Sequence, residues 1–167
     1  RRGRRSGGGA SRRPSEWAFR AVGRVRRRER ARISMADVLG KLSVEEVCEA
    51  LTVLTTATIA GALKAATSEW ERSKGPLPTR FAIVFMGRLG GHETAYGSDA
   101  DVMFVHEAVP DSEPGAAASC AQWLAQKIRS SLAAPGQDPP LEIDADLRPE
   151  GKNGPLVRSL DSYRIYY

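Results

Sequence analysis

Hydrophobic and polar positions alternate along the first half of the chain with a helical period. Over residues 43–71, apolar side chains return every three or four positions, which predicts one long amphipathic helix. Ser43 and Glu46 have the spacing of a capping box, so this helix is expected to begin at Ser43. Residues 15–39 show the same period with fewer apolar members and many arginines. The breaker cluster at residues 75–78 is expected to end the helical part.

The second half has shorter apolar segments. Residues 81–86 and 102–106 are apolar runs of strand length, and apolar positions between 121 and 132 predict a helix. Residues 141–147 alternate strictly, as a strand with one buried face does. Its apolar face carries Leu141, Ile143, Ala145 and Leu147, and its polar face carries Glu142, Asp144 and Asp146. Strands separated by helices predict an α/β or α+β protein.

The chain divides by composition into three parts. Residues 1–14 are basic and of low complexity, and we expect them to be disordered. Residues 15–75 form a helical segment, and residues 76–167 form the α+β core. The net charge of +5 comes mainly from arginines near the N-terminus. A uniformly basic nucleic-acid-binding domain is therefore not indicated, and nucleic acid is not an expected partner.

The arginines of the second part allow two interpretations. Arg24, Arg26, Arg27, Arg28 and Arg30 could bind phosphate groups, since the guanidinium fork matches phosphate oxygens. They could equally form a solvated helix face or pack on an acidic neighbour. The sequence alone favours the second interpretation.

The expected location is the cytoplasm. Only two cysteines occur, Cys48 and Cys120, and they lie far apart in helical patterns, which is typical of a reducing compartment. No apolar run approaches the roughly 20 residues that cross a bilayer, and no secretory signal opens the chain. We therefore expect no contact with a membrane.

The candidate chemistry lies between the two apolar runs. A glycine-rich loop begins at Gly87 and is followed by Asp99 and Asp101 at the start of the second run. Residues at i and i+2 of a strand share a face, so both carboxylates should reach the same place. Carboxylates beside a glycine-rich loop are suited to hold Mg²⁺ against the phosphates of a nucleotide.

A third carboxylate completes this hypothesis. Two Mg²⁺ ions about 3.5–4 Å apart can clamp the attacking and leaving oxygens of a transfer reaction, and three carboxylates usually hold them. Asp144 is the expected third ligand and could also accept the proton of an attacking hydroxyl. Candidate nucleotide contacts come from the loop and from one later arginine. These residues are Gly87, Arg88, Gly97, Ser98 and Arg148.

Two long motifs resemble a known family. Residues 86–105, Met-Gly-Arg-Leu-Gly-Gly-His-Glu-Thr-Ala-Tyr-Gly-Ser-Asp-Ala-Asp-Val-Met-Phe-Val, and residues 143–157 are similar to blocks of the glutamine synthetase adenylyltransferase (glutamate–ammonia ligase adenylyltransferase) family. The resemblance implies a fold like that of DNA polymerase beta, a small mixed sheet with helices. It also implies that Asp99, Asp101 and Asp144 bind metal, and that ATP is the substrate.

The same resemblance implies a function. Members of the family transfer AMP from ATP to a tyrosine hydroxyl of glutamine synthetase and thereby regulate nitrogen assimilation. A related second core in the same polypeptide removes AMP by phosphorolysis, so that the enzymes are multifunctional. The Gly90–Gly91 pair and the Tyr-Gly-Ser-Asp sequence are more similar to the adenylylating core. A PII-type signal protein is a further partner that the family implies.

Three departures from the family pattern leave alternatives open. Asp146 stands where arginine is usual, so either strand carboxylate could be the metal ligand, although alignment of the motif favours Asp144. Thr94 replaces a usual leucine. Because the family continues into a helical bundle, the chain is expected to be a fragment whose activity alone is undecided. The alternative functions are the deadenylylating core and a catalytically inactive binding module.

Overall fold

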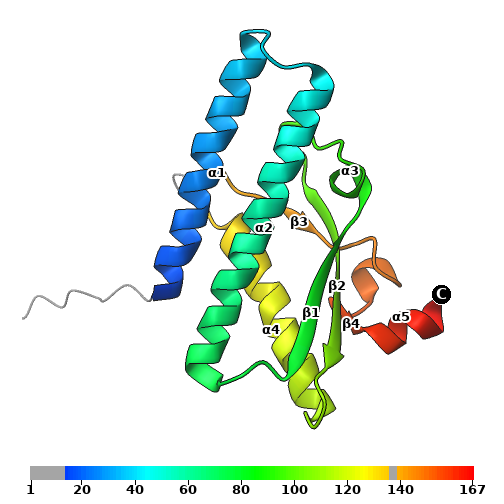
Figure 1. Ribbon diagram of the computed structural model, residues 1–167. Coiled ribbons are helices and arrows are strands. Elements are labelled where there is room, and N and C mark those ends of the chain that lie inside the picture. The colour runs from blue at the N-terminus through cyan, green and yellow to red at the C-terminus, as the bar shows by residue number, and fades with distance from the viewer. Residues whose placement is uncertain (1–13, 136–138) are drawn as a thin grey trace, which may run out of the picture.

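The computed structural model describes residues 14–135 and 139–167. Two long helices, α1 (Pro14–Val38) and α2 (Val44–Lys74), form an antiparallel hairpin along one side of the molecule (Figure 1). The Ser43 hydroxyl accepts the N–H of Glu46, and the Glu46 side chain accepts the N–H of Ser43. This confirms the expected capping box and the beginning of the helix. Disorder was expected for residues 1–14; residues 1–13 lie outside the described residues, and Pro14, where the expectation is wrong, is the first residue of α1.

A four-stranded mixed sheet follows the hairpin. β1 (Thr79–Phe85) pairs antiparallel with β2 (Ala100–Ala108), and β2 pairs parallel with the short strands β3 (Ile143–Asp144) and β4 (Val157–Ser159). One face of β2 is buried because Ala100, Val102 and Phe104 alternate toward the core. The expected α+β class is confirmed by this arrangement.

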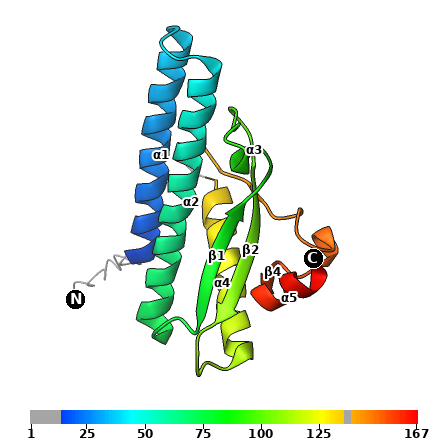
Figure 2. The same ribbon diagram turned by 45° about the vertical axis from the view of Figure 1, so that its right-hand side comes forward.

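Helices cover the buried face of the sheet. α4 (Pro114–Ala133) lies against β1 and β2, and α2 packs on α4 (Figure 2). Two clusters of buried side chains join these layers, one centred on Phe104 and Val102 and one on Trp70 and Leu124. Helix α2 is long and apolar enough to cross a membrane by length and composition alone. In the structure, its buried side chains pack against α1 and α4, and Ile59 packs with buried residues of the sheet.

The predicted strand over residues 141–147 is wrong in its length. β3 contains only two residues, and Leu147 is exposed instead of facing the core. The physical reason is local: an oxygen of the Asp144 side chain accepts the N–H of Asp146 at 2.7 Å. This hydrogen bond turns the backbone away from the sheet, as Asx turns do, so the alternating pattern continues beyond the strand.

Short elements complete the core. α3 (Gly87–Gly90) follows β1 directly, a single turn (Gly151–Asn153) precedes β4, and α5 (Leu160–Tyr166) follows β4. None of these elements was expected from periodicity, because segments of three to seven residues are too short to show a period. α3 and the loop after it occupy the same end of the sheet as β3.

Candidate functional site

Three carboxylates meet at the start of β2. Asp101 and Asp144 are register partners on the adjacent parallel strands β2 and β3, and Asp99 precedes Asp101 by two positions. One carboxylate oxygen from each residue lies within 4.8 Å of those of the other two. The structure therefore brings the three predicted ligands together on one face of the sheet. Their role as metal ligands stays a prediction.

The donor set fits a hard divalent cation. Burial raises the pKa of the Asp101 carboxyl, Asp99 and Asp144 raise it further, and Arg88 opposes this effect. Three negative charges held this close repel one another unless a cation neutralises them. Carboxylate oxygens are the ligands that Mg²⁺ prefers, so Asp99, Asp101 and Asp144 are the residues that would hold it.

Asp146 lies outside this triad. Its carboxylate forms ion pairs of 3.2 Å with Arg148 and 3.3 Å with Lys152. Although desolvation by itself would raise the pKa of Asp146, hydrogen bonds from Lys152 and Arg148 lower it. Of the two candidate carboxylates of this segment, only Asp144 reaches the other aspartates.

The first turn after β1 needs glycine at two positions. Gly87 has a φ of +51°, and a Cβ there would lie 2.9 Å from Cγ of Asp101. A Cβ at Gly90 would collide with the carbonyl oxygen of Phe85. The backbone of α3 consequently lies directly against the triad, and Arg88 of the same turn is close enough to affect the pKa of Asp101.

The loop between α3 and β2 is anchored to helix α2. The N–H of Thr94 donates to the Thr52 hydroxyl at 3.4 Å, and Nδ1 of His92 lies 2.8 Å from a Glu49 oxygen. Thr94, which replaces the usual leucine of the family pattern, is buried. These contacts position the segment that carries Gly97, Ser98 and Asp99.

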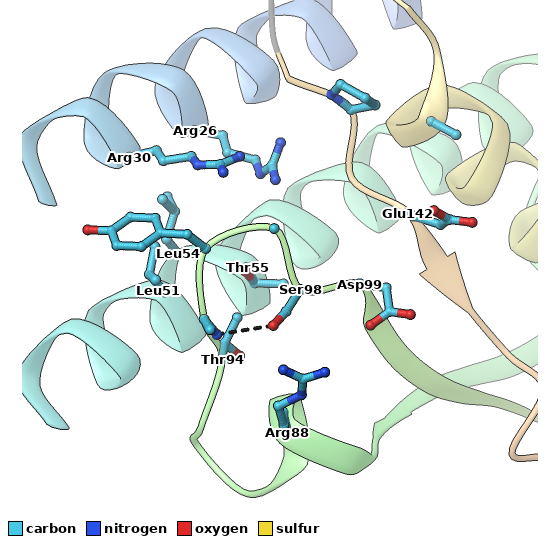
Figure 3. A pocket seen from close by; sticks show the side chains of 15 residues that line it. Arg26, Arg30, Leu51, Leu54, Thr55, Arg88, Thr94, Ser98, Asp99 and Glu142 are labelled. Atoms are coloured by element: carbon cyan, nitrogen blue, oxygen red, sulfur yellow. Dashed lines mark hydrogen bonds between the residues drawn. The ribbon is translucent and has the colours of Figure 1, made fainter. Parts of the chain in front are cut away.

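A cavity of about 680 Å³ opens beside this loop (Figure 3). Asp99 is the member of the triad that lines it, and three of the predicted nucleotide contacts, Arg88, Gly97 and Ser98, line it as well. Helices α1 and α2 form the opposite wall. Pockets of this volume accommodate ligands of nucleotide size.

Arg148 has a different environment from the other predicted contacts. Its guanidinium group donates to the backbone carbonyl oxygens of Ala145 at 2.6 Å, Gly154 at 3.1 Å and Pro155 at 3.1 Å. These bonds hold together the loop that connects β3 and β4. Arg148 does not line the cavity, and its contact with a nucleotide stays a prediction.

Sequence reasoning did not single out several residues of the cavity wall. Leu51, Leu54 and Thr55 belong to the α2 part of this wall, and Glu142 lies next to β3. Glu142 could have been found, because strand alternation places it on the same face as Asp144. The α2 residues could not, because the helical period shows only that one face of α2 is buried.

A small mixed sheet with three acidic side chains at the end of two adjacent strands is consistent with a nucleotidyltransferase-like core. A sequence profile of the family described as glutamate-ammonia ligase adenylyltransferase matches residues 10–167. The chain belongs to this family, which is named for an enzyme activity.

Curated relatives are named bifunctional glutamine synthetase adenylyltransferase/adenylyl-removing enzyme. The protein of Mycobacterium avium (strain 104) is 49% identical over 147 residues, which are 86% of this chain and 15% of the relative. That of Mycobacterium tuberculosis (strain CDC 1551 / Oshkosh) is 48% identical over 159 residues, 95% of this chain and 16% of the relative. The protein of Nocardia farcinica (strain IFM 10152) is 46% identical over 151 residues, which are 90% of this chain and 15% of the relative. The chain thus spans about 15% of the length of these relatives.

Proposed function

We propose that the chain catalyses Mg²⁺-dependent transfer of AMP from ATP to a tyrosine hydroxyl of glutamine synthetase, and so contributes to the regulation of nitrogen assimilation. The observation that supports this proposal most strongly is the meeting of Asp99, Asp101 and Asp144 at the edge of the cavity. Family membership and the names of the relatives indicate the nucleotide and the protein substrate.

The proposed reaction is a displacement at the α-phosphorus of ATP. The tyrosine oxygen forms a bond to this phosphorus, the bond to the β-phosphate bridging oxygen breaks, and pyrophosphate leaves. Mg²⁺ held by the triad would neutralise charge on the attacking and leaving oxygens. Asp144 accepts the tyrosine proton, while Arg88, Gly97 and Ser98 orient the nucleotide. Positioning of this kind supplies most of the catalysis in such transfers.

The direction of the reaction is the second part of the proposal. The Gly90–Gly91 pair favours the adenylylating core over the phosphorolytic one. In the phosphorolytic alternative, phosphate attacks the AMP–tyrosine bond and ADP is released.

To distinguish the two reactions, the chain is incubated with glutamine synthetase and ATP labelled at the α-phosphate. Label on the target supports the proposal, whereas phosphate-dependent loss of label from modified target supports the alternative.

Two neighbouring carboxylates provide a matched pair of variants. Asp144→Asn removes a member of the triad and should abolish transfer of label. Asp146→Asn removes a carboxylate two positions away that binds Arg148 and Lys152 and should leave most of the transfer intact. Equal loss in both variants, with both chains folded, would contradict the assignment of the triad.

A further inference from the structure

Helix α1 provides one wall of the cavity through two arginines. Arg26 and Arg30 are four positions apart, so they lie one turn apart on the same helix face, and both line the cavity (Figure 3). Other arginines of this segment have different surroundings. Arg24 is exposed, and Arg28 is exposed and forms an ion pair with Glu29. The arginine-rich segment therefore has an exposed face, which carries Arg24 and Arg28, and a face toward the cavity, which carries Arg26 and Arg30.

Arg26 connects α1 to the core. It is 9% exposed, and Nη1 donates to the carbonyl oxygen of Pro139, in the segment that leads to β3. A hydrogen bond between residues 113 positions apart fixes where α1 lies over the cavity. It thereby also fixes the position of Arg30, one turn further along.

Arg30 is partly buried and makes no hydrogen bond or ion pair within residues 14–135 and 139–167. A guanidinium group carries a positive charge and five N–H donors. Among the described residues, no nitrogen of Arg30 is both buried and without a partner, and Arg30 lines the cavity. Its N–H groups are therefore available to an anionic ligand there.

The charges that line the cavity are separated in space. Arg26 and Arg30 lie on the side of α1, whereas Asp99 and Glu142 lie toward β3 (Figure 3). Arg88 lies across the loop from the two α1 arginines. This arrangement suits an elongated ligand with a metal-bound group at the carboxylate end and additional negative charge at the other end.

We propose that Arg30, held in place through Arg26, binds the terminal phosphates of the nucleotide, the part that leaves as pyrophosphate. This inference rests on the proposed function, since it assumes that the nucleotide occupies this cavity. The guanidinium fork matches two phosphate oxygens at once, which Lys could not do as well. The helical segment before the core then contributes directly to the site.

Binding of three probes to the purified chain tests this assignment. Inorganic tripolyphosphate, ATP and AMP are titrated calorimetrically, tripolyphosphate without metal and the nucleotides with Mg²⁺. Arg30→Ala should weaken tripolyphosphate and ATP by about tenfold or more, because a charge-assisted hydrogen bond is lost, while AMP is unaffected. Arg30→Lys should recover part of the loss. Arg24→Ala, an exposed arginine of the same helix that does not line the cavity, is the control and should bind all three probes normally.

Each other outcome overturns the inference. An equal loss for AMP and ATP would place Arg30 against the nucleoside, and an unchanged affinity for tripolyphosphate would show that it binds no phosphate. Thermal unfolding of Arg30→Ala should match that of Arg24→Ala, and Arg30→Gln replaces it if the alanine variant is unstable. Failure of the proposed function looks different: Asp101→Asn would then leave Mg²⁺-dependent ATP binding unchanged, while tripolyphosphate binding still reports on Arg30.

Discussion

Substitution of Gly87 by alanine tests the geometry of the triad most directly. Gly87 has a φ of +51°, and an added Cβ would lie 2.9 Å from Cγ and 3.2 Å from Cβ of Asp101. Ordinary contacts between carbon atoms are about 3.5–4.0 Å. The Asp101 carboxylate would therefore have to move by roughly an ångström, away from its position beside Asp99 and Asp144.

Two effects of this substitution can be separated. An alanine with positive φ costs about 1–2 kcal/mol, which corresponds to a fall in melting temperature of about 2–8 °C for a chain of this size. Gly40 has a φ of +63°, and an added Cβ there meets nothing within 4 Å. Gly40→Ala should show the backbone cost alone. Gly87→Ala should show the same backbone cost together with the effect of the displaced Asp101 carboxylate. A misplacement of a catalytic group by about 1 Å can reduce a rate by about 100-fold.

The assay compares the two variants in three measurements. Thermal unfolding gives the shared backbone cost, calorimetric titration with Mn²⁺ or Mg²⁺ gives the metal affinity, and transfer of label to glutamine synthetase gives the activity. Metal affinity and transfer should fall only in Gly87→Ala. If the two variants bound metal equally well, the close approach of Gly87 to Asp101 would not matter for the site, and the predicted displacement of the carboxylate would be wrong.

Three further predictions concern stability. Asp101→Asn should raise the melting temperature of the metal-free chain at neutral pH, and raise it less in acid. The pKa of the Asp101 carboxyl is higher in the folded chain than its ordinary value of 3.8, so the folded state binds the proton more tightly than the unfolded state. The stability of the unsubstituted chain therefore falls as the pH rises from 3.8 toward the pKa of the folded state. Arg148→Ala should lower the free energy of unfolding in urea by at least about 2 kcal/mol, since several carbonyl oxygens lose a charged donor, whereas Lys152→Ala should have little effect. Ser43→Ala should cost about 1 kcal/mol in the same assay, and an unchanged midpoint would show that the cap contributes nothing.

Local signals in the sequence were sufficient for much of the fold. The capping box of Ser43 and Glu46 involves residues three positions apart, so its geometry depends on little else. The pair Asp99 and Asp101 was expected on one face because strand alternation is equally local. Asp144 was expected as the third carboxylate because alternation places it on the polar face of residues 141–147, and the register of β2 and β3 places it opposite Asp101.

Features that depend on side-chain contacts could not be read in advance. The alternating pattern of residues 141–147 continues beyond β3 because the Asp144 side chain, not the sheet, accepts the N–H of Asp146. Arg148 was a candidate phosphate contact, yet most of its donors are directed at carbonyl oxygens of its own loop. In both cases hydrogen bonds from one polar side chain to nearby backbone groups determine the local backbone conformation. Hydrophobic periodicity carries no information about such hydrogen bonds.

The sequence divides into a helical segment, residues 15–75, and a core, residues 76–167, but the site is built from both parts. The wall of the cavity comes from Arg30 and Leu51 of the hairpin as well as from Ser98 and Asp99 of the core. The loop that carries Ser98 is in turn held by the contact between Thr52 and Thr94. A core without the hairpin would retain the three aspartates but lose one wall of the cavity and an anchor of its loop. Nucleotide binding and the position of Asp99 are consequently expected to depend on the helices, whereas the pairing of Asp101 with Asp144 depends on the sheet alone.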